Sequence, residues 1–221
     1  MTASPITLKI DFVSDVVCPW CAIGLAALSQ AAGRLAGQVA LDWHFQPFEL
    51  NPGMGPGGED LFEHLAAKYG SAPEQLRQMH AAIAERGAAL GFAFSERRTR
   101  IYNTFDAHRL LHWLEEQGGA GQRLAFKRAL FKSYFTDAED PGEHAVLLRL
   151  VRAAGLDEAR ARAVLQSDEY AAAVREREAF YQGQGIHSVP AVIINDRHLI
   201  QGGQPVEVFE QALRQIAAQQ V

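Results

Sequence analysis

Cys18-Pro19-Trp20-Cys21 holds the only two cysteines of this 221-residue chain. Before it, apolar and polar residues alternate over residues 6–12, which predicts a strand with one apolar face. After it, apolar residues recur at helical spacing over residues 25–35, which predicts a helix. The cysteine pair therefore lies at a strand-to-helix turn, and this placement constrains the fold more than any other feature of the chain.

The two ends of the chain predict complementary parts of one α/β unit. Residues 39–46 alternate again, so the chain begins as strand, helix, strand. Near the other end, residues 191–194 are a short β-branched run, and residues 198–201 follow closely enough to pair with them as a hairpin. Pro205 then opens a final helix.

The middle of the chain has a different pattern. Residues 51–58 are rich in proline and glycine, and residues 59–182 carry apolar residues at helical spacing. We predict a helical bundle packed around its own core. Because the strand pattern resumes afterwards, this bundle is an inserted domain, and residues 1–58 plus 183–221 form the α/β domain that it interrupts.

Cys18 and Cys21 are predicted to have different roles. Proline is favoured as the first helical residue, so Pro19 makes Cys18 the N-cap. A side chain there faces the free N–H groups of Trp20 and Cys21, and the helix dipole adds positive potential. Both effects favour a thiolate at Cys18. We therefore expect Cys18 to be the nucleophile and Cys21, on the first turn, to resolve the mixed disulfide.

The cysteine pair fits a structural disulfide, a zinc site or a chance occurrence less well than it fits thiol chemistry. A structural disulfide that closes so short a loop contributes little stability. A structural zinc site needs four ligands, and the chain has no second Cys-x-x-Cys; His108 and His112 share a helix face without a matching pair of ligands. A chance occurrence does not account for the placement at a helix start. We therefore expect thiol chemistry and no metal site.

Composition argues against several classes of partner. The formal net charge is −5 and the basic residues form no long block, which argues against nucleic acid. No apolar run reaches the roughly 18 residues of a membrane span. The first residues lack the basic start and apolar stretch of a secretory signal. We expect a cytoplasmic protein that binds neither nucleic acid nor membranes.

Several segments resemble a known family. Cys18-Pro19-Trp20-Cys21 at a helix start, a helical insertion and then Ser188-Val189-Pro190 before a short strand are similar to the DsbA-like branch of the thioredoxin superfamily. The chain resembles the FrnE-like subgroup of this branch in three places: residues 45–52, residues 103–110, and residues 189–194 with 202–205. The resemblance covers nearly the whole chain. It implies an α/β, thioredoxin-like fold with a large α-helical insertion.

The resemblance also implies roles for residues far from the cysteines. It implies that Pro190 is a cis-proline against the cysteine pair, where the backbone of Val189 meets an incoming peptide or thiol. The alternative is a proline that simply opens a strand. Related glutathione-dependent 2-hydroxychromene-2-carboxylate isomerases and kappa-class glutathione transferases typically have serine in place of Cys18. Retaining both cysteines favours thiol–disulfide exchange, with glutathione as a candidate thiol co-substrate and no other cofactor required.

Residues beside the motif have competing interpretations. Pro19 and Trp20 are candidate substrate-binding residues, with Trp20 offering an apolar surface beside the cysteines or else packing into a domain interface. The carboxylate of Asp15 would oppose the Cys18 thiolate, and Asp11 would accept a proton from Cys21. The simpler expectation is that both aspartates are solvated or cap local backbone.

Two further groups are candidate walls of the substrate site. Asn103, Thr104 and His108 open a helix of the insertion, and the resemblance suggests that this helix end faces the cysteines across a groove. Alternatively, Asn103 or Thr104 is an N-cap and His108 is structural. Phe48 and Asn51 lie at the end of the second strand and would form another wall.

The sequence thus predicts a thiol–disulfide oxidoreductase that acts on protein or small-molecule thiols and disulfides. An alternative is a glutathione-dependent isomerase or transferase of the 2-hydroxychromene-2-carboxylate isomerase type. A third hypothesis is a non-catalytic, chaperone-like protein that binds peptides in the groove alone.

Overall fold

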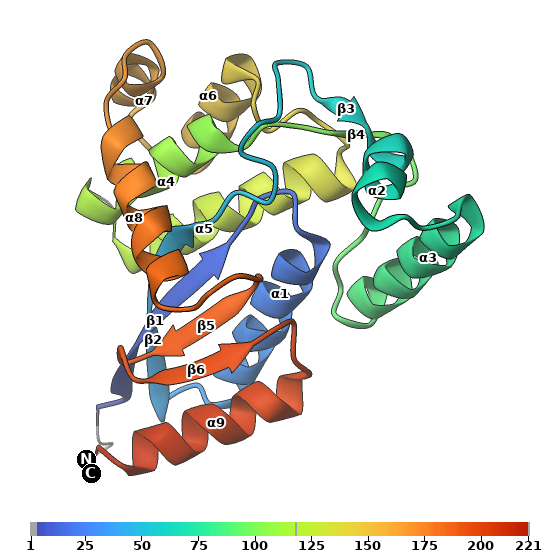
Figure 1. The fold of residues 1–221 in the computed structure, drawn as a ribbon. Coiled ribbons are helices and arrows are strands. Elements are labelled where there is room, and N and C mark those ends of the chain that lie inside the picture. Colours follow the sequence, from blue (N-terminus) through green and yellow to red (C-terminus); the bar gives the residue numbers. More distant parts are fainter. Residues whose placement is uncertain (1–3, 118, 221) are drawn as a thin grey trace.

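The computed structural model describes residues 4–117 and 119–220. Within them, one sheet has the strand order β2-β1-β5-β6. The strands are β1 (Ile6–Ser14), β2 (Val39–Pro47), β5 (Ala191–Ile194) and β6 (His198–Gln201). β1 is parallel to β2 and antiparallel to β5, and β5 and β6 form the predicted hairpin. The two ends of the chain therefore build a single sheet (Figure 1).

Two helices accompany this sheet. Helix α1 (Pro19–Arg34) follows β1, and α9 (Val206–Ala218) lies beside it. Pro205 is the N-cap of α9 rather than its first helical residue. The buried face of α9 carries Phe209 and Leu213, as helical spacing predicted. Cys18 is thus placed at the junction where the central strand β1 passes into α1.

The insertion is mainly helical. Its helices are α2 (Leu61–Tyr69), α3 (Pro73–Ala89), α4 (Phe105–Gln117), α5 (Ala120–Phe131), α6 (His144–Ala153), α7 (Glu158–Leu165) and α8 (Ala171–Gly183), with a π-helical turn η1 (Lys132–Thr136) after α5. In Figure 1 the α2–α3 pair is set apart from the group α4 to α8. The two groups flank the end of the sheet where α1 begins (Figure 1).

Two details differ from the sequence prediction. The segment expected to be wholly helical also contains β3 (Glu59–Asp60) and β4 (Arg100–Ile101), which pair antiparallel. Two residues are too short a run to show a strand pattern. The sequence also did not set α7 apart as a separate helix within that segment, because only its Ala161, Val164 and Leu165 are buried.

The sheet and the insertion share one hydrophobic core. On β2, Trp43 and Phe45 stack with ring centroids 6.0 Å apart, and Phe126 of α5 belongs to the same buried cluster. Arg123 of α5 donates a hydrogen bond of 2.6 Å to the Trp43 carbonyl. The predicted separate core of the bundle is wrong because α4, α5 and α8 pack against β2. Over the described ranges, no helix is both long and apolar enough to cross a bilayer.

Candidate active site

Cys18 occupies the predicted N-cap of α1. Its φ of −88° and ψ of 114° are extended, Pro19 is the first helical residue, and the Cys18 carbonyl accepts hydrogen bonds from the N–H groups of Cys21 and Ala22. The thiol itself does not bond the helix N–H groups, contrary to expectation. It points instead to the Val189 carbonyl, to which it donates at 3.7 Å, because a protonated thiol is a donor.

The two cysteines differ in environment. Both are free thiols, and the exposed fraction is 4% for Cys18 and 0% for Cys21. Burial raises the pKa of the Cys21 thiol well above its usual range, and its hydrogen bond with Cys18 and the charge of that neighbour act in the same direction. Of the two cysteines, Cys18 therefore keeps some contact with solvent and lines a pocket, whereas Cys21 does neither.

A pocket of about 350 Å³ opens at Cys18. The predicted residues Cys18, Pro19, Trp20, Asn51 and Val189 line it. The α2–α3 pair supplies apolar side chains on another side, among them Leu61, Leu65, Tyr69, Met79 and Ile83. Basic and imidazole groups also contribute, namely His64, Lys68, His80 and Arg98. The pocket can hold an apolar group beside the sulfur and a charged or polar group farther away.

Pro190 follows a cis peptide bond, as the resemblance implied. The Pro190 ring lies over Gly24 of α1: a Cβ on Gly24 would be 3.1 Å from Pro190 Cγ and 3.5 Å from the Gly203 Cα. Glycine at position 24 therefore lets two loops from the far end of the chain close onto α1. This close approach sets the Val189 carbonyl beside the Cys18 thiol.

Trp20 is 37% exposed, between the two cysteines in the sequence. The guanidinium carbon of Arg86, in α3, lies 5.4 Å from the centre of the indole ring. Arg86 also donates a hydrogen bond of 2.8 Å to the Gly203 carbonyl. Trp20 thus presents a partly exposed apolar surface beside Cys18, and the Arg86 guanidinium packs against one face of its ring.

Asp15 is buried beside the motif and therefore not solvated, but it caps local backbone as expected, because its carboxylate accepts a hydrogen bond of 3.4 Å from the Val17 N–H. Its carboxylate accepts a hydrogen bond of 2.7 Å from the Leu50 N–H and lies 3.5 Å from Nε2 of the buried His108. Burial alone would raise the pKa of Asp15. The opposing effects of His108, the Leu50 N–H and the Thr104 hydroxyl are larger together and keep this pKa below its ordinary value.

Asp11 is also buried, which again contradicts solvation. Its carboxylate accepts a hydrogen bond of 2.6 Å from the Gln46 amide and pairs with Lys9 at 2.9 Å. These partners lie along the sheet, on β1 and β2. The carboxylate that the structure brings next to the cysteine motif is Asp15, whose carbonyl accepts the Cys18 N–H at 3.2 Å.

Thr104 and His108, at the start of α4, are buried next to Asp15, and neither is among the residues that line the pocket at Cys18. Asn103 lies elsewhere. Its side-chain amide donates a hydrogen bond of 3.0 Å to the Met54 carbonyl and accepts one of 2.8 Å from the Phe105 N–H. Asn103 lines a different cavity, of about 590 Å³. Phe48 is buried in a small separate cluster that includes Tyr181.

Residues 9–214 match the family model of the DSBA-like thioredoxin domain. The chain belongs to this family. A probable DsbA oxidoreductase from Streptomyces coelicolor is 32% identical, with a TM-score of 0.82 over 94% of this chain and 89% of that chain. The resemblance noted in the sequence is thereby confirmed at the level of the family and of the fold.

Two more distant structures share the fold of this DsbA-like protein. A 2-hydroxychromene-2-carboxylate isomerase is 14% identical with a TM-score of 0.73, over 96% of this chain and 97% of that chain. The cytosolic disulfide reductase DsbM from Pseudomonas aeruginosa, solved with GSH, is 17% identical with a TM-score of 0.61, over 94% and 98%. At these identities the likeness concerns the fold.

Sequence reasoning missed Lys127 on α5. Its side chain is fully buried in this DsbA-like protein, with the ammonium 4.9 Å from the centre of the Phe131 ring and 5.8 Å from that of Phe45. The signal was present in the sequence, because Lys127 lies at helical spacing between the apolar residues Leu124 and Phe131. A lysine on the apolar face of a helix is a buried charge that calls for an explanation.

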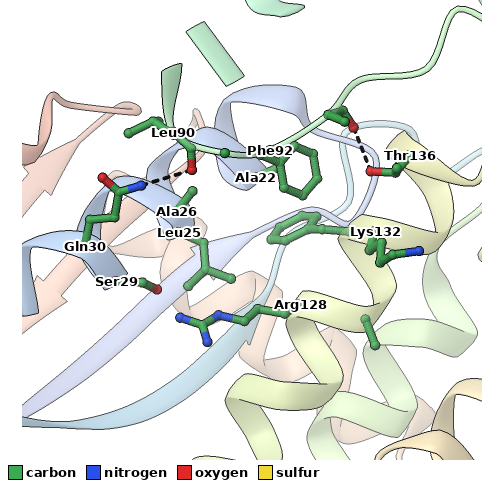
Figure 2. A pocket seen from close by; sticks show the side chains of 14 residues that line it. Ala22, Leu25, Ala26, Ser29, Gln30, Leu90, Phe92, Arg128, Lys132 and Thr136 are labelled. Atoms are coloured by element: carbon green, nitrogen blue, oxygen red, sulfur yellow. Dashed lines mark hydrogen bonds between the residues drawn. The ribbon is translucent and has the colours of Figure 1, made fainter. Parts of the chain in front are cut away.

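A second pocket of the DsbA-like protein, of about 580 Å³, lies between α1 and α5 (Figure 2). Gln30 donates to the Leu90 carbonyl at 3.0 Å and Thr136 to the Ala93 carbonyl at 2.6 Å along its rim. Neither cysteine is among its lining residues. Within residues 4–117 and 119–220, no group of three or more His, Cys, Asp and Glu side chains is placed to hold a metal ion. Of these two pockets, the one at Cys18 is the one that a cysteine lines.

Proposed function

We propose that this protein is a thiol–disulfide oxidoreductase in which Cys18 is the nucleophile and Cys21 resolves. One observation carries the proposal. The Cys18 thiol lies at a helix N-terminus and lines a pocket, while the Cys21 thiol is fully buried one turn along the same helix. This is the arrangement required for one sulfur to meet the substrate and the other to meet only its neighbour.

The reaction proceeds in two exchanges. The Cys18 thiolate attacks a substrate disulfide, one substrate thiolate leaves, and a mixed disulfide joins Cys18 to the remaining sulfur. Cys21 then loses its proton and attacks the Cys18 sulfur, which releases the second substrate thiolate. The protein ends as a disulfide and the substrate has gained two electrons. The same steps in reverse oxidise a dithiol.

The neighbouring groups suggest how a substrate is held. The Val189 backbone would pair with an extended peptide or thiol, with Trp20 and the apolar side chains of α2 and α3 beside it. Glutathione is a suitable small partner, because the DsbM structure was solved with GSH. The cytosolic location of DsbM also favours a cytoplasmic role. Pro190 acts by holding Val189 in place.

Cys18→Ser tests the proposal directly. Reduction of insulin, or refolding of a scrambled protein, should fall to the uncatalysed rate because serine cannot form the mixed disulfide. Cys21→Ser serves as the matched control, since it should still form a mixed disulfide, which then accumulates. Normal insulin reduction by Cys18→Ser would show that the redox assignment is wrong, whereas retained peptide binding without any exchange in the wild type would favour a groove-only binder.

A glutathione-dependent isomerase is the second candidate, because the isomerase structure matches this fold over nearly the whole chain. The presence of both Cys18 and Cys21 favours thiol–disulfide exchange instead. Turnover of a 2-hydroxychromene-2-carboxylate with added glutathione, retained in Cys21→Ser, would favour the isomerase. Its absence, together with disulfide exchange, would favour the oxidoreductase.

A further inference from the structure

Lys127 carries a positive charge that is costly to bury. Its exposed fraction is 0%, and among the described residues its ammonium nitrogen has no hydrogen-bond partner. The faces of the Phe45 and Phe131 rings lie against the charge. A buried cation without a hydrogen bond normally destabilises the folded state. The exchange steps above do not use this side chain.

The titratable groups that act on Lys127 are those of the proposed active site. The charges of Cys21 and Cys18, at the start of α1, and of Asp15, in the turn before that helix, all act on the Lys127 ammonium. His108 of α4 lies against Asp15 on the other side. Burial lowers the pKa of Lys127 to about 8, even though the negative charges of Cys21, Asp15 and Cys18 favour its cationic form.

Cys21 is the member of this group that most needs a cation. Its sulfur has no exposure to water, and burial raises the pKa of its thiol. A thiolate in such a place lacks solvation, so a positive charge nearby has a large effect in the low-dielectric interior. The charge of Lys127 acts on Cys21 in that stabilising direction.

We propose that Lys127 is a positioning residue for resolution, whose buried positive charge stabilises the Cys21 thiolate that attacks the mixed disulfide. This inference rests on the proposed function. In the step concerned, the Cys21 thiol loses its proton and its sulfur attacks Cys18. The bond between Cys18 and the substrate sulfur breaks, and the proton lost by Cys21 ends on the departing substrate thiolate. Lys127 keeps its charge throughout.

Lys127→Met tests the charge while keeping an unbranched side chain of similar length. With oxidised glutathione as substrate, rapid acid quenching and mass spectrometry measure the glutathione adduct at Cys18 and its conversion to the Cys18–Cys21 disulfide. Loss of one favourable charge should lower the thiolate fraction of Cys21, and hence the conversion rate at pH 7, about tenfold. The pH–rate profile of conversion should move to higher pH.

Two comparisons separate resolution from the first attack and from general effects. The first attack is measured alone in the Cys21→Ser background, with and without Lys127→Met, and should change less than conversion does. Arg128→Met removes a charge from the adjacent residue of α5, which lines the pocket of Figure 2 instead, and should leave conversion unchanged. Lys127→Arg, which keeps the charge, should retain more activity than Lys127→Met.

The outcomes distinguish this inference from the proposed function. If the wild type forms no glutathione adduct at all, the proposed function fails. If it does, but Lys127→Met converts the adduct at the wild-type rate and with the wild-type pH profile, Lys127 has no role in resolution. A purely structural role predicts lower stability to urea with an unmoved pH profile, which would equally overturn the inference.

A measurement on the wild type covers the case in which Lys127→Met does not fold. The chain has four lysines, so an NMR spectrum of protein labelled with ¹³C-lysine is simple to assign. Forming the disulfide removes the thiol charges that favour the cation. The ammonium of Lys127 should therefore titrate at lower pH in the oxidised protein than in the reduced one, and identical titrations would contradict the inference.

Discussion

At the scale of single residues, Asp15 connects the insertion to the cysteine turn. Its carboxylate binds the Leu50 N–H after β2 and lies beside His108 at the start of α4. The pKa of Asp15 lies below its ordinary value of 3.8 because these contacts together outweigh burial. A group with a lowered folded-state pKa stabilises the fold above its unfolded pKa and loses that contribution as pH falls through the folded value.

Asp15→Asn should therefore destabilise the reduced protein in a pH-dependent way. At pH 7 we expect a loss of about 1–3 kcal/mol in the free energy of unfolding, the cost of weakening a buried charged hydrogen-bond network. Below about pH 3.8 the carboxyl becomes protonated first in the unfolded chain, and at still lower pH in the folded protein, so the difference should shrink as pH falls. Urea unfolding at pH 7 and near pH 3 measures this, and an equal deficit at both pH values would contradict the account.

The place of a single residue in the site was predictable where its type is rare in the chain, as for cysteine, or restricts the backbone, as for proline. Cys18, Cys21 and Pro190 have such types, and the structure places all three at the end of β1 or against α1. The burial of Asp15 and Lys127 was not predicted, because a charged residue normally indicates a solvated face. Their burial depends on α4 and α5 folding back over the cysteine turn.

At the scale of elements, the site depends on how closely the loop before β5 approaches α1. Gly24 is on the contacting face, where an added Cβ would meet Pro190 at 3.1 Å. Gly33, on the same helix, has no atom within 4 Å of an added Cβ. These two glycines allow the packing contribution to be separated from helix propensity.

Gly24→Val should move the loop that carries Val189, whereas Gly33→Val should not. Both substitutions change the intrinsic helix propensity equally. Overpacking should cost Gly24→Val about 1–3 kcal/mol more in the free energy of unfolding. Its insulin-reduction rate should also fall, because the Val189 carbonyl is no longer beside Cys18. Equal stability and equal activity of the two variants would show that this contact does not position the site.

Elements with a long, regular pattern were predictable from the sequence. The strand β1, the helix α1 and the hairpin of β5 and β6 lie where the spacing of apolar residues predicted them. The pair β3 and β4 was not predictable, because its two-residue strands are specified by tertiary pairing rather than by a local pattern. Helix α7 buries too few large side chains to produce a clear periodic signal.

At the scale of the whole molecule, the insertion contributes residues to the candidate active site as well as enclosing it. The insertion supplies His108, which lies beside Asp15, and Lys127, on which the charges of the cysteines act. It also supplies the wall of the pocket that α2 and α3 form. This follows from the shared core, in which α5 packs on β2. The sequence indicated an insertion but not its contacts, since pairing between distant segments leaves no local pattern.

The whole account depends on Cys18 and Cys21 acting as one redox couple. Equilibrating the wild-type protein with glutathione buffers of graded composition, trapping free thiols and counting them by mass spectrometry tests this most directly. We predict that both thiols disappear together in one two-electron transition, with no stable glutathione adduct at equilibrium. Loss of Cys18 alone as a lasting glutathione adduct, or two thiols that stay free in oxidised glutathione, would contradict the account.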